Sequence, residues 1–276
     1  MREDNFKAVD GLNIFFRSWS PPGKARGVLV IVHGFNSHSG QYLWAAEQFA
    51  ANGFAVYALD QRGRGKSEGR RFYVEKVEDY VDDVTSFVKL AKTREPTLPA
   101  FVLGHSAGGV ISCVYALGRQ SEIAGLICES FALEVPAPAA VLATVKVLAR
   151  IAPRLPVLKL PKPGFSRDQN VVDSMIHDPL IANEVQPAIT VAAMLRANER
   201  LKREFSSIKL PVLILHGTAD TVTLPAGSKL FLETAGSTDK TLKLYPDHVH
   251  DLLNDVGKEK VIADIVGWMT ARLSAH

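Results

Sequence analysis

The chain has 276 residues, of which 47% are apolar and 22% are charged, which is typical of a globular protein and excludes a disordered or fibrous one. Its 32 basic and 29 acidic residues give a formal net charge of +3, too small to indicate a nucleic-acid partner, and we expect none. A chain of this length can bury enough surface for one large core with a small appended lobe.

Two features bear on the compartment of the protein. Residues 1–20 contain no apolar run of signal-peptide length, so we predict a cytoplasmic protein that is not exported. Cys113 and Cys128 stand in apolar surroundings, in a predicted helix and in the strand that follows it. Because a cytosolic chain keeps its thiols reduced, we expect two buried free cysteines rather than a structural disulfide.

Short apolar runs alternate with helical patterns along most of the chain. The runs predicted as strands buried on both faces are Val28 to Val32, Ala55 to Leu59, Phe101 to Leu103, Leu126 to Cys128, Val212 to Leu215 and Leu242 to Tyr245. Apolar residues recur at three- and four-residue steps from Val77 to Val88 and from Val261 to Met269, which predicts amphipathic helices. The alternation predicts an α/β fold with a mostly parallel sheet and helices on both faces, preceded by a polar pair of strands around Asn5 to Trp19.

One segment, residues 131–207, interrupts this alternation. It contains eight prolines between irregular stretches of helical pattern, which indicates a cap or lid inserted into a core formed by residues 1–130 and 208–276. Within it, Ala139 to Ile151 carries only two charges and is too short to span a bilayer. We interpret this stretch either as a helix packed on the main body or as a lid that touches an acyl chain or a membrane surface.

The strongest local motif is Gly104-His105-Ser106-Ala107-Gly108, which follows one predicted strand and precedes the helical pattern from Gly109 to Leu117. A serine hydroxyl is a poor nucleophile unless it is exposed, aimed and placed next to a base. A sharp turn from strand to helix aims it, and only very small neighbours permit such a turn. The motif therefore predicts Ser106 as a nucleophile.

Attack of Ser106 on a carbonyl would create an oxyanion, which needs backbone N–H donors. Ala107, at the start of the helix after the nucleophile, is predicted to supply one of them. The turn after the strand Val28 to Val32 contains Phe35, whose N–H is predicted to be the second donor. His33 begins the same turn, and we interpret it as a structural hydrogen-bonding residue rather than a catalytic base.

A serine hydrolase also needs a carboxylate and an imidazole, which in this arrangement follow the nucleophile in that order. Asp220 stands in the loop after the strand Val212 to Leu215, at a carboxyl end where ligand sites form in open sheets. The loop after the next strand contains both His248 and His250. Asp220 is the predicted acid, and spacing alone does not choose between the two histidines.

Competing motifs are incomplete, so we expect neither a cofactor nor a metal. Gly65-Lys66-Ser67 lacks the earlier glycine of a phosphate-binding loop, and Gly63-x-Gly65 is followed by Glu68 where a dinucleotide fingerprint needs glycine. His248 and His250 have no further ligand at metal-binding spacing. The basic run from Arg62 to Arg71 is interrupted by acids, and we interpret it as a solvated loop rather than a nucleic-acid site.

Four segments together resemble the α/β-hydrolase family, and more narrowly its group of monoacylglycerol lipases and lysophospholipases. The likeness covers nearly the whole chain. The matching segments are the oxyanion turn (Val32 to Gly34 with Ser39 to Tyr42), the turn Ala58 to Ser67, the nucleophile turn Gly104 to Gly109 and the acid loop Leu215 to Asp220.

The resemblance also selects the histidine. In this group Tyr-Pro is followed by three variable residues, His, an acid, two apolar residues, Asn and an acid, and the segment from Tyr245 to Asp255 has this pattern with His250 at the histidine position. His248 then falls among the variable positions. The chain departs from the group at Phe35-Asn36-Ser37, where a smaller residue followed by Gly-Glu is usual, so its acyl pocket is expected to differ in shape.

The resemblance implies a serine ester hydrolase, first of all a monoacylglycerol lipase that forms an acyl-enzyme on Ser106 with Asp220 and His250 as partners. The alternatives are a general carboxylesterase, a lysophospholipase, an amidase or carbamate hydrolase, and a non-enzymatic ligand sensor on the same fold. The expected partners are a small ester with an apolar acyl group and, transiently, a membrane or micelle surface against the cap. The sequence leaves the oligomeric state open.

Overall fold

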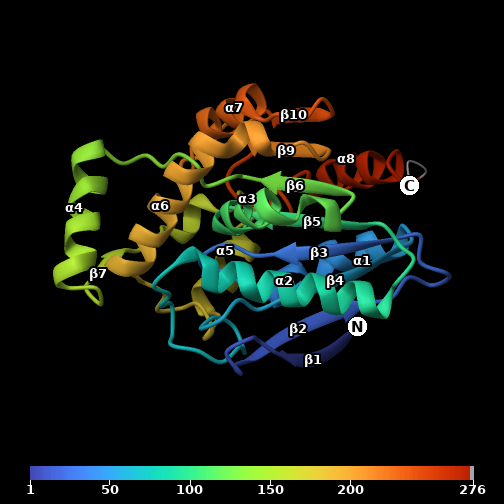
Figure 1. The fold of residues 1–276 in the computed structure, drawn as a ribbon, viewed down its shortest axis with the longest axis horizontal. Helices are drawn as coiled ribbons and strands as arrows, with labels where there is room; N and C mark the ends of the chain where they lie inside the picture. The colour runs from blue at the N-terminus through green and yellow to red at the C-terminus, as the bar shows by residue number, and fades with distance from the viewer. Residues whose placement is uncertain (274–276) are drawn as a thin grey trace.

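An eight-stranded sheet forms the centre of the computed structural model, which describes residues 1–273 (Figure 1). Its strand order is β1-β2-β4-β3-β5-β6-β9-β10, and all neighbours from β4 to β10 run parallel. The strands are β1 (Arg2–Lys7), β2 (Asn13–Trp19), β3 (Gly27–Val32), β4 (Phe54–Leu59), β5 (Ala100–His105), β6 (Gly125–Glu129), β9 (Val212–Gly217) and β10 (Lys240–Tyr245). The predicted α/β class with a mostly parallel sheet is confirmed.

Two details of the strand predictions were wrong. Strands β3, β4, β5, β6 and β9 are buried along their whole length, but β10 is only partly buried, because it is the edge strand and has no neighbour on its outer side. In the N-terminal pair, β1 is exposed as expected of a polar strand. Strand β2 is largely buried, because it lies between β1 and β4 and turns Ile14 and Phe16 into the core.

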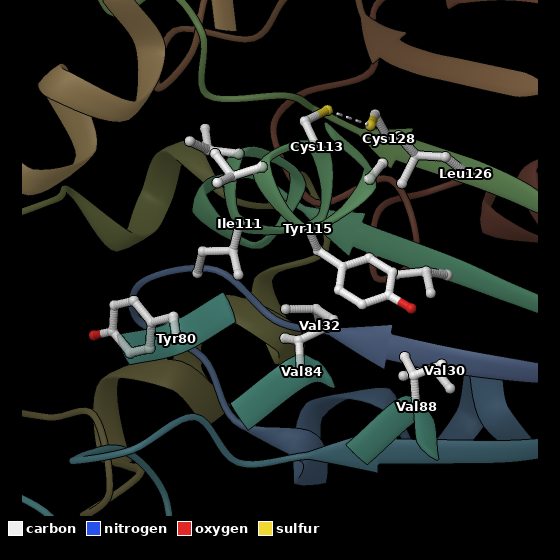
Figure 2. Packing of buried hydrophobic residues seen from close by; sticks show 14 of the residues in the cluster. Val30, Val32, Tyr80, Val84, Val88, Ile111, Cys113, Tyr115, Leu126 and Cys128 are labelled. Carbon is white, nitrogen blue, oxygen red and sulfur yellow. Dashed lines mark hydrogen bonds between the residues drawn. The ribbon is translucent and has the colours of Figure 1, made fainter. Parts of the chain in front are cut away.

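Helices cover both faces of the sheet. On one face lie α1 (Leu43–Ala51) and α8 (Lys258–Thr270); on the other lie α2 (Val77–Arg94), α3 (Ala107–Arg119) and α7 (Pro225–Thr234). Short 3-10 turns occur at η1 (Ser39–Tyr42), η2 (Gln120–Glu122) and η4 (Phe205–Ser207). Figure 2 shows the core between β3, α2 and α3, where Val84 and Val88 of α2 approach Val30 and Val32.

The same core holds both cysteines. Cys113 in α3 and Cys128 in β6 are fully buried and free, with their sulfur atoms 3.5 Å apart (Figure 2). Burial raises the pKa of the Cys113 thiol, so it is held in the unreactive protonated form. The expectation of two buried free thiols is met.

Residues between β6 and β9 form a separate lobe beside the sheet. It contains α4 (Ala139–Ile151), β7 (Pro156–Leu158), η3 (Lys162–Gly164), α5 (Gln169–His177), β8 (Gln186–Pro187) and α6 (Ala188–Glu204). Helix α4 packs mainly against α6, through small residues such as Ala149, Ala188 and Ala192 (Figure 1). Most of α4 is exposed: Val145 and Ala149 are its buried residues.

The lobe is anchored to the sheet by buried polar contacts. The Arg64 guanidinium, which follows β4, pairs with Glu184 and donates a 2.7 Å hydrogen bond to Gln186 of the lobe. Arg62 pairs with Asp83 of α2 at 2.6 Å. Both arginines are buried, so the interpretation of their segment as a solvated loop was wrong for them, because carboxylates elsewhere in the fold compensate their charges.

We expect Glu184→Gln to lower the free energy of unfolding by roughly 3 kcal/mol, because it leaves a fully buried Arg64 charge without its counter-charge. Urea unfolding followed by circular dichroism measures this change. Glu204→Gln is the matched control, since the Arg200–Glu204 pair of the same lobe is exposed and its loss should change the free energy by no more than about 1 kcal/mol. Equal changes in the two variants would contradict the anchoring role of Arg64.

Candidate active site

Ser106 occupies a strained turn between β5 and α3. Its φ of 54° lies in the left-handed region, which side chains other than glycine rarely adopt. The Ser106 N–H donates a 2.9 Å hydrogen bond to the carbonyl of Glu129, which holds the turn against β6. This conformation projects the Ser106 side chain away from the end of the strand. The residue is buried, with 5% of its surface exposed.

Two glycines allow the backbone of the turn after β3 to lie in direct contact with the start of α3. A Cβ atom on Gly108 would lie 2.0 Å from the carbonyl oxygen of Val32. A Cβ atom on Gly34 would lie 2.8 Å from Cβ of Ser106. Neither position has room for a side chain, so the turn that contains Phe35 is held directly beside Ser106.

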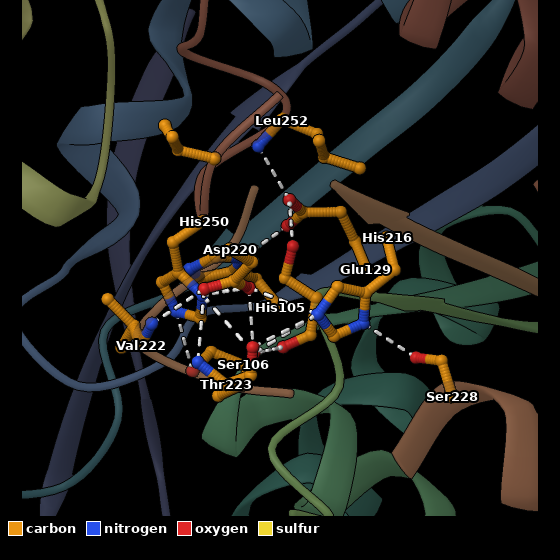
Figure 3. Close-up of polar contacts among 12 residues, drawn as sticks. His105, Ser106, Glu129, His216, Asp220, Val222, Thr223, Ser228, His250 and Leu252 are labelled. Atoms are coloured by element: carbon orange, nitrogen blue, oxygen red, sulfur yellow. Dashed lines mark hydrogen bonds and ion pairs between the residues drawn. The ribbon is translucent and has the colours of Figure 1, made fainter. Parts of the chain in front are cut away.

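His250 lies between Ser106 and Asp220 (Figure 3). Its Nε2 is 3.0 Å from Oγ of Ser106, and its Nδ1 is 2.8 Å from Oδ2 of Asp220. The imidazole is fully buried, and the ring of Phe165 from the lobe packs edge-on against it with 5.0 Å between ring centroids. The structure therefore brings the three predicted side chains into one hydrogen-bonded chain in the order Ser106, His250 and Asp220.

Asp220 is held as a charged carboxylate by its surroundings. Its Oδ1 accepts the N–H groups of Val222 and Thr223 at 2.8 and 3.0 Å, and Thr223 Oγ1 donates to Oδ2 at 2.8 Å. Burial opposes ionisation, but the imidazoles of His216 and His250 outweigh it and hold the pKa of Asp220 well below its usual range. A permanently ionised Asp220 can orient His250 and stabilise its protonated form.

The two N–H groups predicted as oxyanion donors belong to Phe35, next to Gly34 in the chain, and to Ala107, next to Ser106. Among residues 1–273, neither the N–H of Phe35 nor that of Ala107 has a hydrogen-bond partner. Ala107 is the first residue of α3, so its N–H also benefits from the positive end of the helix dipole. The two groups are therefore available to an oxyanion at Ser106.

The other two histidines considered from the sequence lie elsewhere. Nε2 of His33 accepts the N–H of Gln61 at 2.9 Å, and Nδ1 lies 2.7 Å from the carbonyl of Gly34. Burial lowers the pKa of His33 to about 3, so it is neutral and serves as a structural bridge between two turns. His248 contacts the carbonyl of Pro246 through Nδ1 at 2.9 Å, and the hydrogen bond to Ser106 comes from His250.

The family model described as "Serine aminopeptidase, S33" matches residues 23–257. The chain belongs to this family of α/β hydrolases. It is 33% identical to a monoacylglycerol lipase of Mycolicibacterium smegmatis over 98% of both chains, and 33% identical to human monoglyceride lipase over 96% of this chain and 89% of the relative. Among solved structures, the monoacylglycerol lipase of Paleococcus ferrophilus aligns with a TM-score of 0.84 at 33% identity, covering 94% of this chain and 99% of that one.

Several residues at this S33 hydrolase site were missed by the sequence analysis. They are Glu129, whose carboxylate lies behind the site, Thr223, which donates to Asp220, and Phe165, which covers His250. A charged residue directly after the apolar run Leu126 to Cys128 was a usable signal for Glu129. No comparable signal marks Phe165, which reaches the site only through the fold of the lobe.

Gly108→Ala is expected to abolish most ester hydrolysis and lower the melting temperature, because its Cβ atom would meet the Val32 carbonyl at 2.0 Å and push the two turns apart. Thermal unfolding and nitrophenyl ester turnover measure both effects. Gly118→Ala in the same helix is the control, since a Cβ atom there meets nothing within 4 Å. It should retain full activity and equal or higher stability. A fully active Gly108→Ala would show that close backbone contact is not required.

Proposed function

We propose that this chain is a monoacylglycerol lipase that releases a fatty acid and glycerol. The observation that carries the proposal is the single imidazole, His250, within hydrogen-bond distance of both Ser106 Oγ and Asp220 Oδ2. Similarity to named monoacylglycerol lipases along nearly the full length of the chain supports this substrate class. We also propose that residues 131–207 act as the cap, and residues 1–130 and 208–276 as the hydrolase core.

The first half of the reaction forms an acyl-enzyme. His250 Nε2 takes the proton of the Ser106 hydroxyl as Oγ attacks the ester carbonyl carbon. The N–H groups of Phe35 and Ala107 stabilise the oxyanion, and Asp220 stabilises the resulting imidazolium. When the carbon–oxygen bond to glycerol breaks, His250 returns the proton to the departing alkoxide oxygen. Water then attacks the acyl group by the same steps and releases the fatty acid.

A groove between α4, α6 and the loop after β6 is suited to the acyl chain. Its volume is about 290 Å³, and its apolar lining includes Leu133, Val135, Leu142 and Leu195. The loop is tied to the nucleophile, because the N–H of Ala132 donates to the Ser106 carbonyl at 3.3 Å. The groove is also lined by Glu134, Lys146, Glu199 and Lys202, and we propose that the acyl group follows this loop from Ser106 to the apolar side chains.

Phe35 and Asn36, which differ from the residues usual in the resembling group, change the wall of the site. The Phe35 ring packs under the Arg64 guanidinium at 4.4 Å. Asn36 adopts a left-handed φ of 53°, and its N–H donates to Glu184 of the cap at 2.8 Å. In this chain the oxyanion turn is thereby attached to the cap, and we propose that the attachment restricts the pocket near the ester and favours acyl chains directed toward α4.

We further propose that the outer face of α4 docks on an anionic lipid surface. Val147 and Ile151 stand one turn apart on it, with exposures of 56% and 74%. From Val135 to Arg167 the chain has six basic residues and no acidic one. Lys146 and Arg167 pair with Glu199 and Asp255 outside this segment, and the remaining basic residues beside the apolar side chains suit the boundary of an anionic membrane or micelle. No helix among residues 1–273 is long and apolar enough to cross a membrane.

Ser106→Ala should abolish nearly all release of fatty acid from monoacylglycerols while leaving the fold intact, because it removes the hydroxyl that lies 3.0 Å from His250 Nε2. The measurement is free acid released from glycerol esters of graded chain length and from nitrophenyl esters. Ser112→Ala, which removes another buried serine hydroxyl of α3, is the matched control and should keep wild-type rates.

Two outcomes of this experiment would contradict the proposal. Wild-type turnover by Ser106→Ala would exclude the mechanism. Cleavage of short nitrophenyl esters alone, with no turnover of glycerol esters, would exclude the substrate class and leave a general carboxylesterase.

Sedimentation with lipid vesicles tests the docking of α4. Wild-type protein should bind vesicles with roughly a third anionic lipid more tightly than purely zwitterionic ones, by about tenfold at low salt. Val147→Ser with Ile151→Ser should weaken binding to both kinds of vesicle. Val9→Ser is the control, since Val9 is 75% exposed but lies on the β1–β2 turn. Equal binding by the α4 variant and the wild type would refute docking through this face.

A further inference from the structure

A buried carboxylate, Glu129, lies at the carboxyl end of β6, between the strand that leads to the nucleophile and the strand that leads to the acid. It is paired in the sheet with His105 of β5 on one side and with Leu215 of β9 on the other. Its side chain is fully buried. The proposed mechanism assigns it no role, although Figure 3 shows it among the residues around Ser106, His250 and Asp220.

Glu129 contacts both halves of the site. Its backbone carbonyl accepts the Ser106 N–H at 2.9 Å. Its Oε1 accepts the N–H of Leu252, two residues after His250, at 2.7 Å. Its Oε2 pairs with Nδ1 of His105, the residue immediately before the nucleophile. One residue therefore ties the nucleophile turn to the loop that carries the catalytic base.

A carboxylate at this depth needs a compensating charge, and His105 is placed to supply it. Burial alone would lower the pKa of His105, but Glu129 outweighs burial and raises it to about 9. The other acidic groups that face His105 are Asp251 and Asp220. The centroids of the His105 and His250 rings are 4.9 Å apart. His105 is thus a cation surrounded by acids at neutral pH, and loss of its proton leaves the Glu129 charge unpaired.

We propose that Glu129 and protonated His105 form a positioning pair that holds the His250 loop at hydrogen-bond distance from Ser106, and that the pair acts only while His105 keeps its proton. The inference rests on the proposed roles of Ser106 and His250 and adds a residue pair that touches neither substrate nor reacting atoms. Under this proposal, full activity requires that His105 is protonated as well as that His250 is in place.

Glu129→Gln is the informative variant. The amide keeps an oxygen that can accept the Leu252 N–H, but it removes the charge that keeps His105 protonated. We expect kcat for glycerol esters at pH 7.5 to fall by about tenfold, with KM nearly unchanged because the acyl groove is untouched. Asp83→Asn, which removes a buried carboxylate paired with Arg62 away from the site, is the control and should keep the wild-type kcat.

The pH profile separates positioning from simple structural support. The positive charge of His105 is present below its raised pKa and is lost as pH rises, so wild-type kcat should fall as pH passes about 9. In Glu129→Gln, His105 is already neutral at pH 7.5, so this alkaline fall should be absent. Asp83→Asn should show the wild-type fall. A folded Glu129→Gln with wild-type kcat, or with the same alkaline fall, would overturn the proposal.

A measurement on the wild-type protein covers the case in which Glu129→Gln does not fold. At pH 8, nitrogen NMR of histidine-labelled protein should show at least one of the eight histidines with both ring nitrogens protonated. If all eight are neutral, the proposal is wrong. Ser106→Ala, assayed in parallel, tells the two hypotheses apart. If it keeps turnover the proposed function fails, whereas an inactive Ser106→Ala beside an unaffected Glu129→Gln overturns only the positioning pair.

Discussion

The close approach of the turn after β3 to the first turn of α3 is the constraint on which the site depends. Gly108 meets the Val32 carbonyl, and Gly34 meets Ser106, at distances that leave no room for a side chain. The same turn carries Phe35, α3 begins at Ala107, and Ser106 between β5 and α3 has a left-handed conformation. The contact fixes the two turns relative to one another, so the proposed nucleophile and oxyanion donors keep their relative positions whichever loops supply Asp220 and His250.

Buried charges are arranged as pairs that join separate segments. Arg62 with Asp83 ties the turn after β4 to α2, and Arg64 with Glu184 ties the same turn to the cap. His105 with Glu129 lies directly behind the site. A single buried charge would destabilise the fold, so each pair requires its two segments to stay together. This requirement gives the loops at the carboxyl edge of the sheet defined positions despite their lack of regular structure.

The lobe that we propose as the cap is attached more firmly at one end than at the other. Its segment next to the base is attached firmly: Asp251 N–H donates to the Phe165 carbonyl at 2.8 Å, and Arg167 pairs with Asp255 at 2.9 Å. Helix α4 has few buried residues and packs mainly on α6. A movement of this lobe would therefore cost least at α4, which lines the proposed acyl groove, while Phe165 keeps its contact with His250.

The sequence by itself determined the layers of the fold and most of the candidate site, because these depend on local patterns. Apolar periodicity marked six strands and helices α2 and α8, and small residues around Ser106 marked the strained turn. Asp220 was identified by its place after a buried strand, whereas the choice of His250 over His248 needed either the family resemblance or the measured distances. Only the tertiary structure decided that Arg64 is buried against Glu184, that β10 is partly exposed at the sheet edge, and that Glu129 reaches the backbone of Leu252. Those contacts join residues far apart in the chain, and no local pattern encodes which loops will meet once the sheet has formed.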